Sequence, residues 1–437
     1  MTNNVPPPAS AGSPKTFAPQ TRAPQTRAPQ AFAALQVPGY GMYMLGSGLA
    51  MTADSIEHVI SYWMVFQKFQ SPALAGYAVI SHWLPFLLFS VTAGALADRL
   101  DPRRIIQAGM LLFIGCSLGW GVLFMTGTLE LWHAVVLFSL HGFAGVLWGP
   151  ASQLLIHHIV GHEQLHSAVR LLSMSRVAGL LGGPAVGGAM LLAFGPSASV
   201  IIGALMYLPL TLWLVRAPFR RKAHQEPPQE TPRGGRGGGI LATAREVAGN
   251  RVVVSMTLLA GATSFVIGNA FQAQMPEFAA DLGHGDADVY YSMLLAANAA
   301  GALTAGMILE SRGVRHAEPR IAFGLVILWC LCMGGFAVSS VYLLSLALLF
   351  GAGFLNLAFG AMSQTLVQMH APPAIRGRVI GLYGTSFNGM RAFSGVTVGM
   401  GGSLVGVHWS LAVSAVALAI ITAGLYVFDR RSGTVQP

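Results

Sequence analysis

The sequence predicts an all-α membrane protein with twelve transmembrane helices, arranged as two parallel repeats of six. Three observations lead to this prediction: the composition, a series of long apolar runs, and a similarity between the two halves. Of the 437 residues, 54% are hydrophobic and only 9% are charged, against roughly 25% charged residues in a soluble domain. No single soluble core can bury this excess, so lipid must solvate part of it. The runs are continuous rather than alternating, which excludes a transmembrane barrel.

The apolar runs define the predicted helices in chain order. The first six fall at about 40–67, 73–97, 104–125, 131–157, 166–193 and 197–216. The second six fall at about 251–275, 288–309, 320–338, 341–369, 376–404 and 408–428. Each run is about as long as a bilayer-spanning helix requires. We therefore divide the chain into a tail (1–36), an N-terminal bundle (37–217), a linker (218–250), a C-terminal bundle (251–428) and a second tail (429–437).

The first 36 residues are rich in Pro, Ala, Gln and Thr, and the segment 21–25 is repeated at once as 26–30. Such a segment cannot bury enough apolar surface to order itself, so we expect it to be disordered. It lacks the apolar core of a signal peptide, and we expect it to be retained in the cytoplasm.

The basic residues predict the orientation in the membrane. They cluster in the loop after the second helix, around the linker, after the eighth helix, before the eleventh and in the tail, whereas only Lys68 falls on the other side. Cytoplasmic loops of membrane proteins carry this excess of Lys and Arg, so both termini are predicted to be cytoplasmic. The net charge of +9 is thereby explained as an orientation signal, and nucleic acid is not expected as a partner.

Two segments of the first half recur in the second. Gly94, followed four residues later by Asp98, corresponds to Gly306 and Glu310, and the segment 148–155 resembles 359–366; the offsets are 212 and 211 residues. Two unrelated matches at nearly one offset indicate a duplicated unit. Because six helices is an even number, the two copies have the same orientation, and a substrate pathway is expected between them.

Two acidic residues lie deep in the first predicted helix. Asp54 and Glu57 are three residues apart, which places both on one helix face, with His58 beside them. A carboxylate inside a membrane is costly unless it faces water, pairs with a cation or is protonated. We therefore predict that one of them carries the coupling proton and contacts a cationic substrate. The alternative is that both form fixed pairs with buried arginines.

Two arginines within apolar runs are candidates for that pairing. Arg176 of the fifth helix is predicted as a partner of the acids, and Arg391 of the eleventh as a cavity or gating residue. Other polar residues inside the runs are predicted to line the cavity or to form interhelical hydrogen bonds: His141, Gln153, Asn269, Gln272, Asn298, Asn356, Gln364 and Asn388. His158, His162 and His166 span a helix end and are interpreted as a solvated loop. No metal site, cofactor or catalytic arrangement is predicted.

The fifth helix carries a run of small residues with a proline: Gly179, Gly183, Pro184, Gly187 and Gly188. Small residues permit close helix packing, and the proline favours a bend. The loop after the second helix contains a dense set of charges after Gly94, namely Asp98, Arg99, Arg103 and Arg104. We expect Asp98 to face the amino terminus of the eleventh helix and to hold the cytoplasmic side closed.

This loop resembles the signature loop of the major facilitator superfamily, and the Gly-Pro segment resembles a motif of its proton-driven exporters. Segments such as Leu84-Pro85, Gly149-Pro150 and Arg376-Gly-Arg378 look like the branch that contains the enterobactin exporter and macrolide-efflux proteins. The resemblance implies proton-coupled efflux of a small amphiphilic compound by alternating access, in a monomer in a bacterial inner membrane, with the proton gradient as the energy source. The alternatives are a proton-coupled importer and a lysophospholipid-moving protein.

Overall fold

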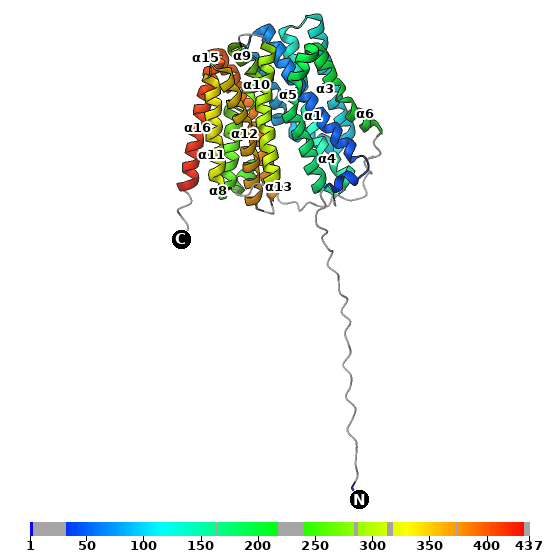
Figure 1. Cartoon of the computed structure of the whole chain (residues 1–437). Helices are drawn as coiled ribbons and strands as arrows, with labels where there is room; N and C mark the ends of the chain where they lie inside the picture. Colours follow the sequence, from blue (N-terminus) through cyan, green and yellow to red (C-terminus); the bar gives the residue numbers. More distant parts are fainter. Residues whose placement is uncertain are drawn as a thin grey trace.

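The structure is a computed structural model of the chain. It describes residues 1–2, 32–161, 164–216, 240–283, 287–312, 318–372 and 375–431. The described residues form helices and no strands, arranged as two bundles that lie side by side (Figure 1). The start of α1 and the end of α16 lie at the same end of the molecule (Figure 1). An even number of crossings would place them so.

The N-terminal bundle begins with a short 3-10 helix, η1 (Ala33–Gln36). Its membrane-length helices are α1 (Tyr40–Phe69), α2 (Pro72–Arg99), α3 (Pro102–Thr126), α4 (Leu131–Val160) and α5 (Leu165–Leu205), and it ends with α6 (Leu208–Arg216). The helix starts follow from local sequence. The Ser71 side chain accepts a hydrogen bond from the Leu74 amide, with proline at the next position, and Asp101 caps α3 in the same way.

The C-terminal bundle contains α8 (Arg251–Val266), α9 (Ala270–Leu282), α10 (Ala287–Arg312), α11 (Pro319–Val338), α12 (Tyr342–His370) and α16 (Val407–Arg431). Between α12 and α16 the chain forms a broken helix of five pieces: α13 (Arg376–Gly384), η3 (Thr385–Gly389), α14 (Arg391–Ser394), η4 (Gly395–Met400) and α15 (Gly401–Val405). Both η3 and η4 are π-helical. A short amphipathic helix, α7 (Ile240–Val247), precedes the bundle.

Most predicted helices agree with these bounds to within a few residues. The boundary expected between 193 and 197 is wrong, because α5 continues through the non-helical Gly195 to Leu205, and the predicted seventh helix is divided into α8 and α9, which ends at Leu282. In the described part of the chain, nine segments have the length and hydropathy of a membrane span. One of them, 167–216, is long enough for two, and Gly195 breaks it with a φ of 72°. Neither α1, which contains charged residues, nor the broken helix 376–405 is among these nine segments. The count of twelve therefore stays a prediction.

Two predictions, about the tail and the linker, need correction. Residues 33–36, expected to be disordered, form η1. The amide of its buried residue Ala34 donates a hydrogen bond to the Ser167 hydroxyl of α5. Residues 240–247, expected to be linker, form α7. The expected bend at Pro184 stays a prediction; the non-helical residue inside α5 is Gly195, directly before Pro196. The remainder of the predicted tail and linker, at 3–31 and 217–239, and residues 432–437 lie outside the described residues.

The small residues of α5 pack as predicted. A Cβ added at Gly179 would lie 2.7 Å from the carbonyl oxygen of Gly48, and one at Gly183 would lie 2.4 Å from Ser55 Cβ. Gly187 likewise faces Ile56 and Val59. Side chains larger than glycine at these positions would push α5 away from α1. Gly188 instead faces Ser292 of α10 in the other bundle.

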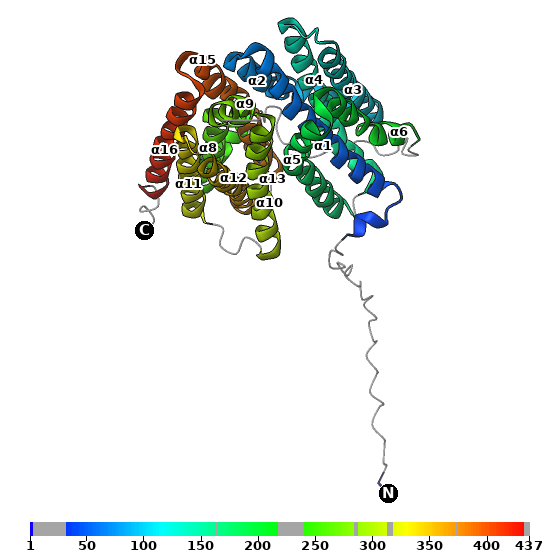
Figure 2. The same ribbon diagram turned by 45° about the horizontal axis from the view of Figure 1, so that its top comes forward.

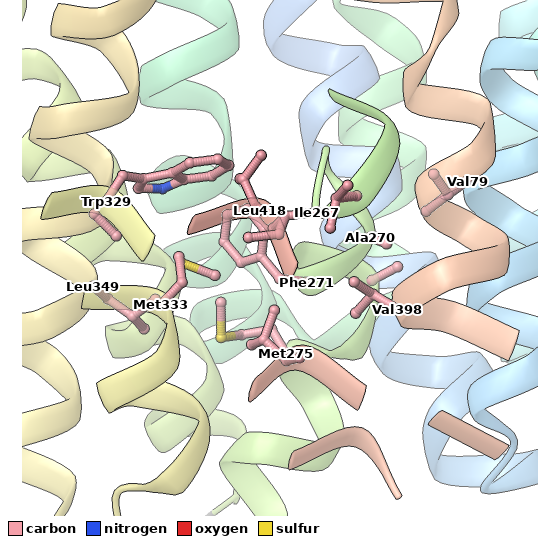
Figure 3. Close-up of a cluster of buried hydrophobic side chains, with 14 of the residues drawn as sticks. Val79, Ile267, Ala270, Phe271, Met275, Trp329, Met333, Leu349, Val398 and Leu418 are labelled. Carbon is pink, nitrogen blue, oxygen red and sulfur yellow. The ribbon is translucent and has the colours of Figure 1, made fainter. Parts of the chain in front are cut away.

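The two bundles meet at the end of the molecule that contains the α1–α2 connection. One large hydrophobic core combines residues from both bundles, and Figure 3 shows part of it, with Val79 of α2 near Val398 of η4. The second core draws on the N-terminal bundle alone and includes Tyr40, Ile105 and Leu214, toward the α2–α3 end. In Figure 2, α2 runs close to α15 and α9 of the C-terminal bundle. The bundles thus share a core at one end only.

Hydrogen bonds between the bundles in the described part of the chain follow the same pattern. The Tyr291 hydroxyl donates to the Val59 carbonyl oxygen at 2.8 Å, and its ring stacks on Trp63 at 5.0 Å. Gln274 donates to the carbonyl oxygen of Pro72 at 3.0 Å, at the start of α2. The structure is therefore closed at the α1–α2 end.

The charged loop between α2 and α3 provides a stability prediction. The hydrogen bond from Arg103 lowers the pKa of Asp101 below its ordinary value. A carboxylate with a lowered pKa stabilises the fold above the unfolded-state value of about 3.9, and this contribution disappears as the pH falls through the folded-state pKa. We expect Asp101→Ala to cost about 1 kcal/mol at pH 7, mainly through the lost helix cap. Thermal unfolding in detergent should show the parent–variant difference shrinking on acidification. A difference independent of pH would contradict this.

Candidate functional site

The two acids of α1 converge on one histidine of α4. The Nε2 atom of His141 lies 2.8 Å from Oδ1 of Asp54, and its Nδ1 atom lies 2.8 Å from Oε1 of Glu57. Ser117 of α3 donates a hydrogen bond to the other oxygen of Glu57. The side chains of His141 and Glu57 are each only 4% exposed, and that of Asp54 is 12% exposed. Spacing along α1 brings the acids together, and the packing of α3 and α4 supplies their partners.

This geometry requires a shared proton. An ionised carboxylate only accepts hydrogen bonds, so both ring nitrogens donate only when His141 is an imidazolium; if the ring is neutral, one carboxyl group carries the proton. In either pattern the trio of Asp54, Glu57 and His141 holds one proton in common and has a net charge of −1. Removing that proton would leave two buried negative charges with a neutral partner, which is costly in a medium of low dielectric.

Two more histidines border the trio. His58 of α1 lies with its Nδ1 2.7 Å from the carbonyl oxygen of Asp54, and its ring meets those of His82 and His141, each at 4.7 Å. The Nδ1 atom of His82, from α2, is buried and has no hydrogen-bond partner among the described residues. One ligand atom each from Asp54, His58, His82 and His141 lies within 4.8 Å of the others. In the described part of the chain these four residues could hold a metal ion, although the sequence predicts none.

The expected pairing of the acids with Arg176 is wrong, because His141 takes that place. The Arg176 guanidinium instead lies over the Trp148 ring, 4.4 Å from its centroid. Arg391 lies between Phe387 of η3 and Trp83 of α2, at 4.8 and 4.9 Å from the ring centroids. Trp83 belongs to the N-terminal bundle, so Arg391 reaches across the interface between bundles. Neither guanidinium has a carboxylate partner among the described residues.

Of the polar residues expected to line the cavity, only His141 joins the acids. Asn269, Gln272, Asn298 and Asn356 are partly exposed, and Gln153, Gln364 and Asn388 are exposed. The expected contact of Asp98 with the eleventh helix stays a prediction, because the Asp98 side chain lies outside the described part of the chain. The surroundings of Gly94 lie outside it as well. In the same loop, Arg103 pairs with Asp101 at 2.6 Å, Arg104 donates to Gln107 at 3.2 Å, and Arg99 is exposed at the end of α2.

The sequence interpretation missed Ser117 and His82. The signal available for His82 was its position inside an apolar run. Its ring centroid lies 4.8 Å from that of the neighbouring Trp83. Nothing in the spacing of Ser117 distinguishes it from a serine that bonds its own helix. Of the three histidines expected in a loop, His158 instead lies in the last turn of α4, which ends at Val160, whereas His162 and the side chain of His166 lie outside the described residues.

Two similar helical bundles that share a core at one end, with buried ionisable groups inside, define a membrane transporter of the major facilitator type. Comparisons with known proteins agree. Over 300 residues the chain is 25% identical to the enterobactin exporter EntS of Shigella boydii, covering 67% of this chain and 68% of that protein. The transporter YfiS of Bacillus subtilis is 27% identical over 168 residues, covering 38% of this chain and 39% of that protein.

Solved structures show the same fold. A bacterial homologue of the human lysosomal transporter Spinster, in an inward-facing and unoccupied conformation, matches 90% of this chain and 96% of its own with a TM-score of 0.70 and 15% identity. The nucleoside transporter NupG matches 89% of this chain and 98% of its own with a TM-score of 0.63 and 17% identity. The profile of the transmembrane secretion effector family covers residues 30–434. The chain belongs to this family of major facilitator transporters, whose members are not enzymes.

Proposed function

We propose that this protein is a secondary transporter that exports a small amphiphilic compound in exchange for protons. The observation that carries the proposal is the trio of Asp54, Glu57 and His141, in which two buried carboxyl groups each lie 2.8 Å from a nitrogen of one imidazole. Export is supported by the name of the Shigella relatives, at 25% identity. We further propose a monomer in a bacterial inner membrane, with both termini in the cytoplasm and the α1–α2 end outside, following the distribution of basic residues.

In this orientation the structure represents the state that is closed to the outside. The trio then holds its single proton in the cytoplasm-facing half of the transport cycle. Arrival of a second proton from outside would neutralise one carboxylate and weaken its bond to His141, which joins α1 to α4. Because Gly179, Gly183 and Gly187 pack α5 directly on α1, a shift of α1 would also move α5. Gly188 of α5 touches Ser292 in the other bundle, so this movement would reach the bundle interface.

Proteoliposomes with an imposed pH gradient test the proposal. Enterobactin and a panel of amphiphilic amines, carboxylates and neutral compounds are added, and collapse of the gradient is followed in the parent, Asp54→Asn and Glu57→Gln. We expect some compound to collapse the gradient in the parent and at least one variant to lose this activity by tenfold or more. Glu130→Gln is the matched control, since this exposed acid caps the start of α4 in the same bundle. Transport that is independent of the gradient and equal in all variants would contradict the proposal and favour a facilitator or lipid-moving protein.

A further inference from the structure

The charge balance of the buried groups differs from the one that the sequence suggests. Two acids and two arginines inside apolar runs would neutralise one another. In the structure, His141 satisfies both acids, so Arg176 and Arg391 are left without a carboxylate among the described residues. An arginine is always charged in proteins and offers five N–H donors. A cation at membrane depth without an acidic partner is costly and calls for another explanation.

Arg391 has the better surroundings for a ligand. Its guanidinium lies against the faces of Trp83 and Phe387, which come from different bundles, and no hydrogen bond from its side chain is present in the described structure. Stacking on rings fixes the plane of the guanidinium and leaves its N–H edge available. The side chain is partly exposed. The N–H edge, which has no hydrogen-bond partner among the described residues, is the part of the side chain that an anionic group would contact.

The backbone around Arg391 is unusual in a way that is independent of its charge. Two π-helical segments, η3 and η4, lie immediately before and after the four-residue helix α14 that Arg391 begins. Such segments are rare and occur frequently at functional sites, because the widened turn redirects side chains at a cost in helix stability. The ring of Phe387, inside η3, lies parallel to that of Tyr383, with centroids 5.9 Å apart. Phe387 of η3 and Tyr383 of the preceding α13 thus stack into an aromatic pair, and the Phe387 ring also contacts the cation.

We propose that Arg391, with Trp83 and Phe387, forms a binding site for the anionic head of an aromatic amphiphile, such as a carboxylate or phenolate. This inference deepens the proposed function and rests on it for the role of the bound compound as cargo. The planar guanidinium would hold the oxyanion through two parallel hydrogen bonds, and the rings would cover the aromatic body. Because Trp83 and Arg391 belong to different bundles, one bound molecule would contact both halves of the transporter.

Equilibrium binding to the purified full chain in detergent tests this site without a proton gradient. The probes are 1-naphthoate, the neutral 1-naphthylmethanol and the cationic 1-naphthylmethylamine, which share one ring system. We expect the parent to prefer 1-naphthoate. Arg391→Gln should weaken its binding by about 10- to 100-fold, the range of a charge-assisted hydrogen bond. The affinity of Arg391→Lys for 1-naphthoate should lie between those of the parent and Arg391→Gln, because the charge is kept but the planar fork of N–H donors is lost. Arg320→Gln, a surface arginine paired with Glu318, is the matched control.

Thermal unfolding tests whether the variant Arg391→Gln still folds. Arg391→Gln removes a cation without an acidic partner, so its unfolding temperature should equal or exceed that of the parent. Equal affinity of the parent for the three probes, or unchanged binding of 1-naphthoate by Arg391→Gln, would overturn the site. If the site fails while the pH-gradient assay succeeds, proton-coupled export stands without it. If binding holds but the gradient assay fails, Arg391 binds anions in a transporter without proton coupling.

Discussion

His141→Leu should destabilise the protein by about 3–5 kcal/mol and abolish coupled transport. The substitution removes the partner of two buried carboxylates, and an uncompensated buried charge accounts for costs of this size. Glu57 would retain Ser117, but Asp54 would keep only the neighbouring His58 at 3.7 Å. Unfolding of the purified protein in detergent at pH 7, followed by heat or denaturant, measures the loss.

Two further variants make this prediction specific. The triple variant Asp54→Asn, Glu57→Gln, His141→Leu should recover most of the lost stability, because it leaves no ionised carboxylate at this place in the bundle. His408→Leu is the matched control: His408 also contacts an acid, Asp281, at 3.0 Å, but that carboxylate is 55% exposed. Exposed pairs contribute about 0–1 kcal/mol. A small loss in His141→Leu, similar to that in His408→Leu, would mean that the trio is not a strongly coupled unit.

Gly76→Val should open the α1–α2 end and reduce transport by tenfold or more. Gly76 of α2 faces Gly395 and Gly399 of η4, and an added Cβ would lie 2.4 Å from the Gly395 carbonyl oxygen and 2.9 Å from the Met400 amide nitrogen. Both neighbours are backbone atoms, which cannot move aside as a flexible side chain could. The bundles would have to separate at this end, so the balance between closed and open states shifts.

Spin labels on the two bundles measure this opening. One label replaces Gln67 near the end of α1, and the other replaces Leu404 of the exposed α15, in a chain whose free cysteines, Cys116, Cys330 and Cys332, have been removed. The distance distribution should move to longer values in Gly76→Val. Gly115→Val in α3 is the control, since nothing lies within 4 Å of an added Cβ there. An unchanged distribution in Gly76→Val would show that this contact does not hold the end closed.

The sequence predicted most helices because long apolar runs depend only on local composition. The broken helix was not foreseen, since 376–404 has the composition of one apolar helix, whereas η3, α14 and η4 pack against α2 of the other bundle, a contact that the local sequence does not specify. Gly195 rather than Pro184 interrupts α5, because a proline can be accommodated in a helix whereas a φ of 72° cannot. Helix boundaries and repeats were accessible from the chain; the places where helices depart from regular geometry were not.

The candidate site was predictable only in part. The spacing of Asp54 and Glu57 placed both on one face of α1, and the structure confirms that they share a partner. That partner could not be deduced, because the helix that meets this face is decided by tertiary packing. A count of buried charges favoured Arg176 as the partner of the acids. Such a count treats an imidazole as neutral, so His141 was predicted only among the residues that line the cavity or bond between helices. That Arg176 and Arg391 have no carboxylate partner among the described residues, and hence the anionic ligand that we infer for Arg391, could be recognised only once the position of His141 was known.

Reciprocal coupling tests the central claim most directly. If protons drive a substrate, a gradient of that substrate must drive protons in return. Proteoliposomes containing a trapped pH-sensitive dye, without an initial pH gradient, are given a gradient of a compound found to be transported. The account predicts a proton flux opposite to the compound in the parent, absent in the triple variant of Asp54, Glu57 and His141. Movement of the compound with no change in internal pH in the parent would contradict proton exchange.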